Sequence, residues 1–279
     1  MVYKKYGEVF KRIRKQQGFA ISDFTSIGIP KSTLSDFECG KTMMSLEKVD
    51  SALQRMGSGL AQFDNYLNNY ITADTVLLLE EAEEAYFKDD RKKLEELLTI
   101  SEQQQYRVVY SAIKIILGRQ EVQDISRTTT FLFDAQTWGH AELYIYYIIM
   151  DFLDNNEILK IYDNFKKNSN GICESRIFNR EIVLALCRAS NVLAYRGYKS
   201  DSLKIIKYME KQKLTEDRMF LRMLLYGTKG VWIYHFLNKD EGREKIKFFL
   251  DIQKKLSPSE IYMYFNKRYQ KYINIIQPE

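Results

Sequence analysis

The sequence predicts an all-α protein with two domains, on the strength of three observations. The chain has 279 residues, a length that is long for one compact domain and comfortable for two. It contains only three prolines and 13 glycines, the residue types that helix interiors exclude. Apolar residues recur at helical spacing in the first 60 residues and again from Asp74 onward.

Four short helices are expected in the first 60 residues. The first spans residues 5–17 and the second spans about 21–27. A third begins at Pro30, since a missing N–H costs nothing in the first turn, and ends at Gly40, which suits a left-handed cap. The fourth starts after Ser45, an N-cap residue.

The stretch GSGLAQFDNYLNNYITADT, with its glycines, asparagines and few charges, predicts the domain boundary. We expect a first domain over 1–66, a linker over 67–72 and a second domain over 73–279. Residues 1–60 hold ten Lys or Arg against six Asp or Glu, which is +4 of the chain's net charge of +5. A basic first domain on a nearly neutral body predicts an anionic partner for the first domain alone.

The segment PKSTLSDFECG has the features of a helix that reads DNA. Leu34 and Phe37 point inward, and Glu38 faces the bundle or ties the helix ends together. Four outward polar side chains are expected to reach base edges, namely Lys31, Ser32, Thr33 and Ser35. Four basic side chains are expected on phosphates, where they add affinity without sequence information, namely Arg12, Arg14, Lys15 and Lys41. Double-stranded DNA is therefore the predicted partner.

Together with Gly28, this segment resembles the helix-turn-helix of the Cro/C1 type, in which a glycine precedes Ser-x-x-Thr-[Ile/Leu]-Ser-x-x-Glu-x-Gly. Pro30 replaces the first serine of that pattern. Ile21 stands where such proteins often have a DNA-contacting glutamine. Asp36 replaces a commonly basic residue, so it either accepts from a cytosine amine or pairs with a neighbouring lysine. Cys39 is interpreted as a small packing residue, with a redox switch as the alternative.

The second domain repeats one pattern: an aromatic-rich helix, a charged turn and a Leu/Ile-rich helix. The turns lie at 87–98, 117–125, 153–162, 195–206 and 237–250. Their spacing of roughly 30 to 43 residues is typical of helix-pair solenoids. The stretch GYKSDSLKIIKYMEK resembles the second helix of a tetratricopeptide unit, with Ser202 in the small-residue position. We expect a degenerate tetratricopeptide-like array, and an ordinary helical bundle is the alternative.

No catalytic, metal or cofactor site is expected. His140 and His235 are the only histidines and lie far apart, and the three cysteines lack metal-ligand spacing. The carboxylates of LLLEEAEEAYF are interpreted as a solvated helix face; they are Glu80, Glu81, Glu83 and Glu84. The protein is therefore not expected to be an enzyme.

A cytoplasmic location is predicted from two further features. The first residues, MVYKKYGEVFKRIRK, lack the apolar region of a signal peptide. The longest apolar run, LYIYYIIM, is far shorter than the ~20 residues that a membrane span needs.

A concave solenoid offers a groove for an extended peptide. Residues 179–195 are apolar almost all round and are predicted to form an inner helix, which Arg188 and Asn191 interrupt. A buried asparagine needs a partner, because burying its amide unpaired costs free energy. The partner is either a neighbouring helix or a ligand backbone, toward which asparagine both donates and accepts.

The whole layout resembles the Rgg/GadR/MutR transcriptional regulators of Gram-positive bacteria, a class of cytoplasmic quorum-sensing peptide receptors. The resemblance rests on the Cro-like head and, in order along the helical body, on TWGHAELYIYY and ASNVLAYRGYKSDSLKII. It implies a homodimer that binds a palindromic promoter site and senses a short hydrophobic peptide on the concave face. It also implies that Asn191 holds the peptide backbone, and we assign side-chain or carboxylate contacts to Arg188 and Arg180. Tyr147 and Ile148 depart from the family, which often has Gly-Asn there.

The last predicted helix, residues 257–277, is rich in Tyr and Ile. Its apolar face needs cover, which predicts a partner chain; the alternative is that it caps its own solenoid. Two functions stay open at this point. One is a peptide-responsive transcription factor, and the other is a peptide-independent dimeric repressor or antitoxin-like regulator whose body only dimerises or binds a protein.

Overall fold

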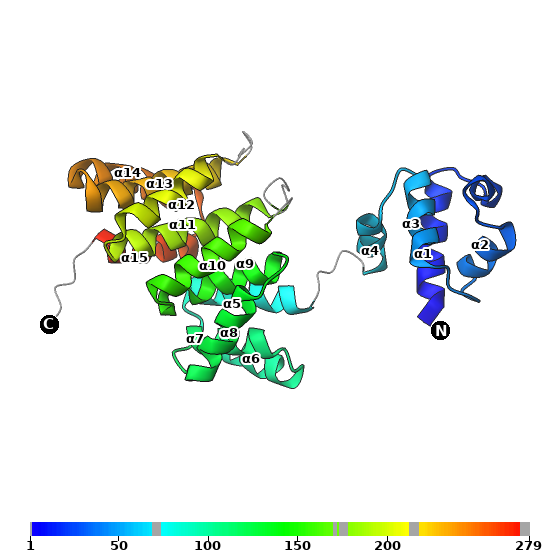
Figure 1. Cartoon of the computed structure of the whole chain (residues 1–279), viewed down its shortest axis with the longest axis horizontal. Helices are drawn as coiled ribbons and strands as arrows, with labels where there is room; N and C mark the ends of the chain where they lie inside the picture. Colours follow the sequence, from blue (N-terminus) through cyan, green and yellow to red (C-terminus); the bar gives the residue numbers. More distant parts are fainter. Residues whose placement is uncertain (1, 69–73, 170–171, 173–177, 212–217, 274–279) are drawn as a thin grey trace. The chain divides into compact units, whose positions relative to one another are not determined.

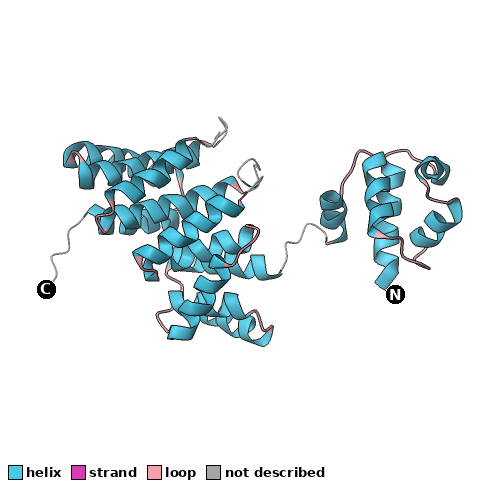
Figure 2. Ribbon diagram, viewed as in Figure 1, coloured by secondary structure: helices cyan, strands magenta, loops and turns pink. Residues whose placement is uncertain are grey.

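The computed structural model describes residues 2–68, 74–169, 172, 178–211 and 218–273, and every regular element in these ranges is helical (Figure 2). The predicted all-α fold is confirmed. The chain divides into two compact units, Met1–Ala73 and Asp74–Glu279. Residues 69–73, most of the expected linker, lie outside the described residues.

The first unit is a small helical bundle around a phenylalanine core. Its elements are α1 (Val2–Gln16), the 3₁₀ helix η1 (Ile21–Ile27), α2 (Lys31–Glu38), α3 (Leu46–Arg55) and α4 (Leu60–Leu67). The ring of Phe10 contacts those of Phe24 and Phe37 edge-on, with centroids 6.2 and 5.5 Å apart. Ser45 accepts a hydrogen bond from the backbone N–H of Lys48, as its predicted N-cap role requires.

Two glycines set the approach of α1 to α2. A Cβ on Gly7 would lie 2.0 Å from the carbonyl oxygen of Phe37, so the two helices meet at a distance that only glycine permits. Gly40 has a φ of 70°, the left-handed conformation expected of it.

The stretch interpreted as the domain boundary is partly helical. Phe63 and Leu67 of α4 stand one turn apart and are buried in the core of the first unit. Leu67, which was expected to open the linker, is instead the last residue of this helix.

In the part of the second unit that the structure describes, the helices form five pairs and a closing helix (Figure 1). They are α5 (Asp74–Lys88), α6 (Arg91–Gln103), α7 (Arg107–Ile116), α8 (Val122–Phe133), α9 (His140–Ile149) with η2 (Met150–Phe152), α10 (Asn155–Asn168), α11 (Asn179–Tyr195), α12 (Lys199–Glu210), α13 (Met219–Phe236), α14 (Lys239–Leu256) and α15 (Ser259–Ile273). Each of the five predicted charged turns falls between the two helices of one pair. The tetratricopeptide-like prediction is therefore confirmed. Ser202 is fully buried in the small-residue position, where the hydroxyl of Ser190 donates to its carbonyl.

The helix α11 is the inner helix that the sequence predicts. All residues from Glu181 to Ala194 are buried, because α11 packs against α9, α12, α13 and α15. The last helix, α15, returns to pack on α5, the first helix of the body. Four of its aromatic side chains are buried by the chain itself, namely Tyr264, Phe265, Tyr269 and Tyr272. The prediction that a partner chain covers this face is wrong for these residues.

Candidate functional site

The exposed face of α2 carries the side chains predicted to read DNA. Lys31 and Ser32 are exposed, and Thr33 and Ser35 are half-buried. On the opposite face Leu34 and Phe37 are fully buried, as predicted. Sequence spacing therefore gave the correct inner and outer faces of this helix.

Three of the four predicted phosphate-binding side chains are exposed. They are Arg12, Lys15 and Lys41. Lys41 lies with its Nζ 3.3 Å from Oδ1 of Asp36, so pairing with a lysine is the observed alternative for this aspartate. Cys39 is exposed, and its interpretation as a packing residue is wrong.

Arg14 is a correction to the prediction. Its side chain is only 8% exposed, and Nη2 donates to Oε2 of Glu38 at 2.8 Å while Nη1 donates to the carbonyl of Phe19 at 2.7 Å. The hydrogen bond to Glu38 raises the pKa of the guanidinium. Arg14 thus ties α1 to α2 and to the following turn, and it has no surface to offer a phosphate.

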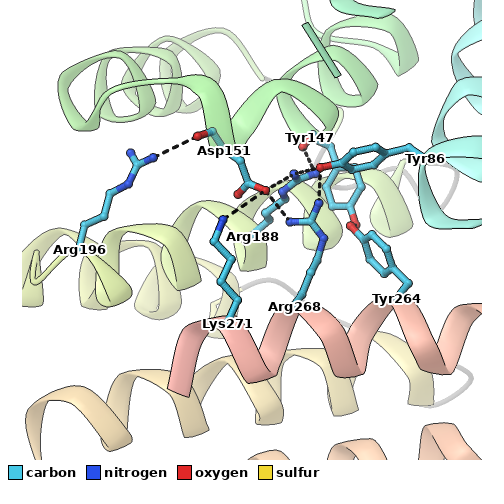
Figure 3. A network of polar contacts seen from close by, with 8 residues as sticks. All are labelled: Tyr86, Tyr147, Asp151, Arg188, Arg196, Tyr264, Arg268 and Lys271. Atoms are coloured by element: carbon cyan, nitrogen blue, oxygen red, sulfur yellow. Dashed lines mark hydrogen bonds and ion pairs between the residues drawn. The ribbon is translucent and has the colours of Figure 1, made fainter. Parts of the chain in front are cut away.

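In the second unit, a polar cluster around Asp151 joins four elements (Figure 3). Oδ2 of Asp151, on η2, accepts from Arg188 of α11 at 3.1 Å and from Arg268 of α15 at 3.0 Å. The same two guanidiniums donate to the hydroxyl of Tyr86 on α5, at 3.1 and 2.7 Å. Lys271 Nζ lies 4.0 Å from the same carboxylate oxygen.

The Asp151 cluster has more positive than negative charge. Burial alone would raise the pKa of Asp151, but Arg188, Arg268 and Lys271 hold it well below its usual range. Within the described residues, the buried Nε atoms of Arg188 and Arg268 have no hydrogen-bond partner. The single carboxylate of Asp151 therefore pairs with three cations, and the Nε donors of the two arginines stay without an acceptor among the described residues.

Asn191 lies in a small cavity next to this cluster. It lines a cavity of about 20 Å³, room for about one water, together with Arg188, Tyr269 and Tyr272. Its Nδ2 donates to Oγ1 of Thr228 on α13 at 3.4 Å, so the interhelical hydrogen bond is present. Its Oδ1 has no partner among the residues that the structure describes.

Tyr147, which stands where the resemblance led us to expect a glycine, connects two helices of the second unit. Its hydroxyl lies 2.6 Å from that of Tyr264, so it links α9 to α15, and its carbonyl accepts from Arg188. A small residue there would leave α15 without this contact.

Two larger cavities flank the contact between α5 and α15. The first, here called the α15 cavity, has a volume of about 570 Å³ and is lined by Tyr86, Phe87, Lys88, Asp89, Asp151, Glu260, Met263, Tyr264, Lys267, Arg268 and Lys271. The second, the acidic cavity, has about 580 Å³ and is lined by Glu80, Glu83, Glu84, Phe87, Lys88, Tyr144, Arg180, Glu181, Pro258, Glu260 and Ile261. The three predicted peptide contacts are thus divided, because Arg180 lines the acidic cavity while Arg188 and Asn191 lie in the small one.

The interpretation of the α5 glutamates as a solvated face is wrong at Glu83. This side chain is buried and accepts from both terminal nitrogens of Arg180 at 3.2 Å. Burial raises its pKa, and Arg180 offsets this effect only in part.

Within the described ranges, no group of histidine, cysteine and carboxylate side chains is arranged to hold a metal ion. No helix in those ranges is both long and apolar enough to cross a membrane.

Residues 78–267 match the family model described as the C-terminal domain of the HTH-type transcriptional regulator Rgg, which is well over half of the chain. The chain belongs to the Rgg family. Its fold also matches solved structures along nearly their whole length. Rgg2, the SHP pheromone receptor of Streptococcus dysgalactiae, is 19% identical, with a TM-score of 0.75. The match covers 95% of this chain and 99% of the Rgg2 chain.

Two further structures show the same two-part fold. A putative transcriptional regulator from Listeria monocytogenes EGD-e is 15% identical, with a TM-score of 0.77 and coverage of 97% of this chain and 98% of that chain. PrgX in its complex with cCF10 is 17% identical, with a TM-score of 0.66, and the match covers 96% of this chain and 92% of the PrgX chain. The predicted membership of a family of peptide-receptor regulators is confirmed.

No pattern in the sequence pointed to Asp151, Tyr86 or Arg268. These residues come from three segments up to 182 positions apart, and each has an ordinary local context. Only the fold brings them together.

Replacing Arg14 by Met should destabilise the protein by about 3–5 kcal/mol, because it leaves Glu38 as an unpaired buried charge. Chemical unfolding of the variant measures this loss. The exposed Lys15→Ala should leave stability unchanged and reduce the salt slope of DNA binding by about one. The structural role assigned to Arg14 would be contradicted if the Arg14→Met variant kept normal stability and its DNA binding depended less on salt.

Replacing Asp151 by Asn should cost about 3 kcal/mol at neutral pH, since two buried guanidiniums lose their counter-charge. A carboxylate whose pKa is lower in the folded than in the unfolded protein stabilises the fold fully at pH values above its pKa in the unfolded state. This stabilisation is lost as the pH falls toward its pKa in the folded state. The difference in free energy of unfolding between wild type and variant should therefore become smaller at pH values below 3.8, the ordinary pKa of aspartate. Urea unfolding at several pH values measures it. Asp163→Asn, at the exposed ion pair with Lys204, is the matched control and should change little; an equal effect of both would refute the role of Asp151.

Proposed function

We propose that this chain is a cytoplasmic transcriptional regulator that binds a palindromic promoter site as a homodimer and is controlled by a short, largely hydrophobic peptide. The observation that carries the proposal is the charge imbalance of the Asp151 cluster beside the α15 cavity. The printed names of the relatives support it: Rgg2 is called an SHP pheromone receptor, and another similar structure is called a bacterial peptide pheromone/receptor complex.

The α15 cavity has the chemistry of a site for a peptide carboxylate. Its wall holds Arg268 and Lys271, which share Asp151 with the deeper Arg188. A second carboxylate would supply the missing negative charge, and a guanidinium binds one through paired hydrogen bonds. Phe87 and Met263 line the same cavity and offer apolar contact to a neighbouring side chain.

We keep Asn191 as a proposed contact to the peptide backbone through its unpartnered Oδ1. This contact requires Tyr269 and Tyr272, which line the same small cavity, to move away from it. Arg188 lines the small cavity and not the α15 cavity, so it is proposed to contact the ligand only beside Asn191. Arg180 is already paired with Glu83 and is proposed only to border the ligand.

Dimerisation follows from the size of the head. One small helix-turn-helix buries too little DNA for a selective site, so two copies on two half-sites are required. The terminal repeat leaves apolar surface that a second copy can cover, since Phe248 and Leu256 of α14 are 53% and 80% exposed.

Replacing Ser32 and Thr33 together by Ala should lower affinity for the promoter site by about 1–3 kcal/mol per lost base contact, while affinity for random DNA stays the same. Fluorescence anisotropy with both DNAs measures the ratio. Ser51→Ala, on the exposed face of α3, is the control. Equal losses on both DNAs would mean that these side chains do not read bases.

Peptides encoded by short reading frames next to the gene should change the affinity of the protein for its promoter DNA. Lys271→Ala should weaken the response to such a peptide, and amidation of the peptide carboxylate should have the same effect, because both remove one partner of the proposed ion pair. Lys207→Ala, on the exposed side of α12, should leave the response intact. If no such peptide bound, the peptide-independent repressor would be the better account.

A further inference from the structure

The acidic cavity has an excess of negative charge that its own cations do not balance. Five of its lining residues are glutamates, and two are basic, which gives a net charge of −3. Both cations are already engaged, since Lys88 lies 2.6 Å from Glu84 and Arg180 lies 3.2 Å from Glu83.

Glu181 is the strongest indication of a ligand. Its side chain is 9% exposed, and it lines the cavity from the first turn of α11. Its Oε2 has no hydrogen-bond partner among the described residues, and Oε1 has only the hydroxyl of Tyr144 at 3.4 Å and Nδ1 of His140 at 4.0 Å. An unpaired buried carboxylate costs several kcal/mol, so this group calls for a cation.

The cavity suits an organic cation better than a metal ion. In the described part of the chain, no set of acidic side chains is close enough together to hold a metal. An ammonium group can instead donate three hydrogen bonds to separated oxygens. The rings of Phe87 and Tyr144 add faces that attract a cation, and Ile261 contributes apolar wall.

We propose that the acidic cavity binds a primary ammonium group of the peptide ligand, with Glu181 and Glu83 as its counter-charges. The inference rests on the proposed peptide-sensing function and specifies how the peptide lies. Its ammonium enters the acidic cavity, and its carboxylate enters the α15 cavity, which shares Phe87, Lys88 and Glu260 with the acidic cavity. The ammonium comes either from the peptide N-terminus or from a lysine side chain.

Three synthetic probes with a free C-terminal carboxylate test the proposal by calorimetric titration of the full chain: Leu-Ile-Ile-Val with a free N-terminus, its N-acetyl form, and an N-acetyl form that contains one lysine. The free amine should bind about tenfold or more tightly than the acetylated probe, which corresponds to ~1.4 kcal/mol per factor of ten. Tight binding of the lysine probe would assign the ammonium to a side chain, and weak binding would assign it to the N-terminus; both results support the site. Equal affinities of the free and acetylated probes, or no binding of the free amine at millimolar concentration, would overturn it.

Glu181→Gln provides the matched variant. It should remove the preference for the free amine and, without ligand, should raise stability, because it eliminates an unpaired buried charge. Glu102→Gln, an exposed change on α6, should alter neither property. Retention of the preference in Glu181→Gln would overturn the role of this residue. If only the ammonium site were wrong, these tests would fail while a peptide would still change the affinity for promoter DNA. If the proposed function were wrong, that change in promoter affinity would be absent.

Discussion

The carboxylate of Asp151 is the constraint on which the arrangement of the second unit depends. It accepts from one arginine of the inner helix α11 and one of the closing helix α15, and both arginines also hold the hydroxyl of Tyr86 on α5. Buried guanidiniums are tolerated only with a counter-charge, so α15 must lie where Arg268 can reach Asp151. The position of α15 in turn creates the cavities on either side of its contact with α5. Structural pairing and the proposed ligand binding thus use the same few charges.

The same rule explains the head. Arg14 and Glu38 are 24 positions apart, and their buried pair fixes α1 against α2. Because this pair removes Arg14 from the surface, the proposed phosphate contacts fall to Arg12, Lys15 and Lys41, which stay exposed. In both units the charges inside the fold set the geometry, and the charges left on its surface or cavity walls are available to a partner.

Local patterns in the sequence were sufficient for most of the fold. Turn composition located all five helix pairs, the Ser45 cap was correct, and the all-apolar character of residues 179–195 identified the inner helix. Features that depend on distant partners were not predictable. Arg14 and Glu83 have the spacing of exposed residues, yet each is buried against a partner that lies far away in sequence. The aromatic face of α15 looked unpartnered because its cover is divided among four helices, α5, α11, α13 and α14.

The proposed function requires that a peptide bound by the second unit and DNA bound by the first unit are thermodynamically coupled. Coupling is reciprocal, so a peptide that changes DNA affinity by some factor must have its own affinity changed by the same factor when DNA is bound. The most direct measurement is the dissociation constant of a neighbouring-gene peptide for the protein, free and saturated with promoter DNA. The account predicts two different constants whose ratio equals the effect of the peptide on DNA binding. Identical constants for a peptide that binds would contradict it.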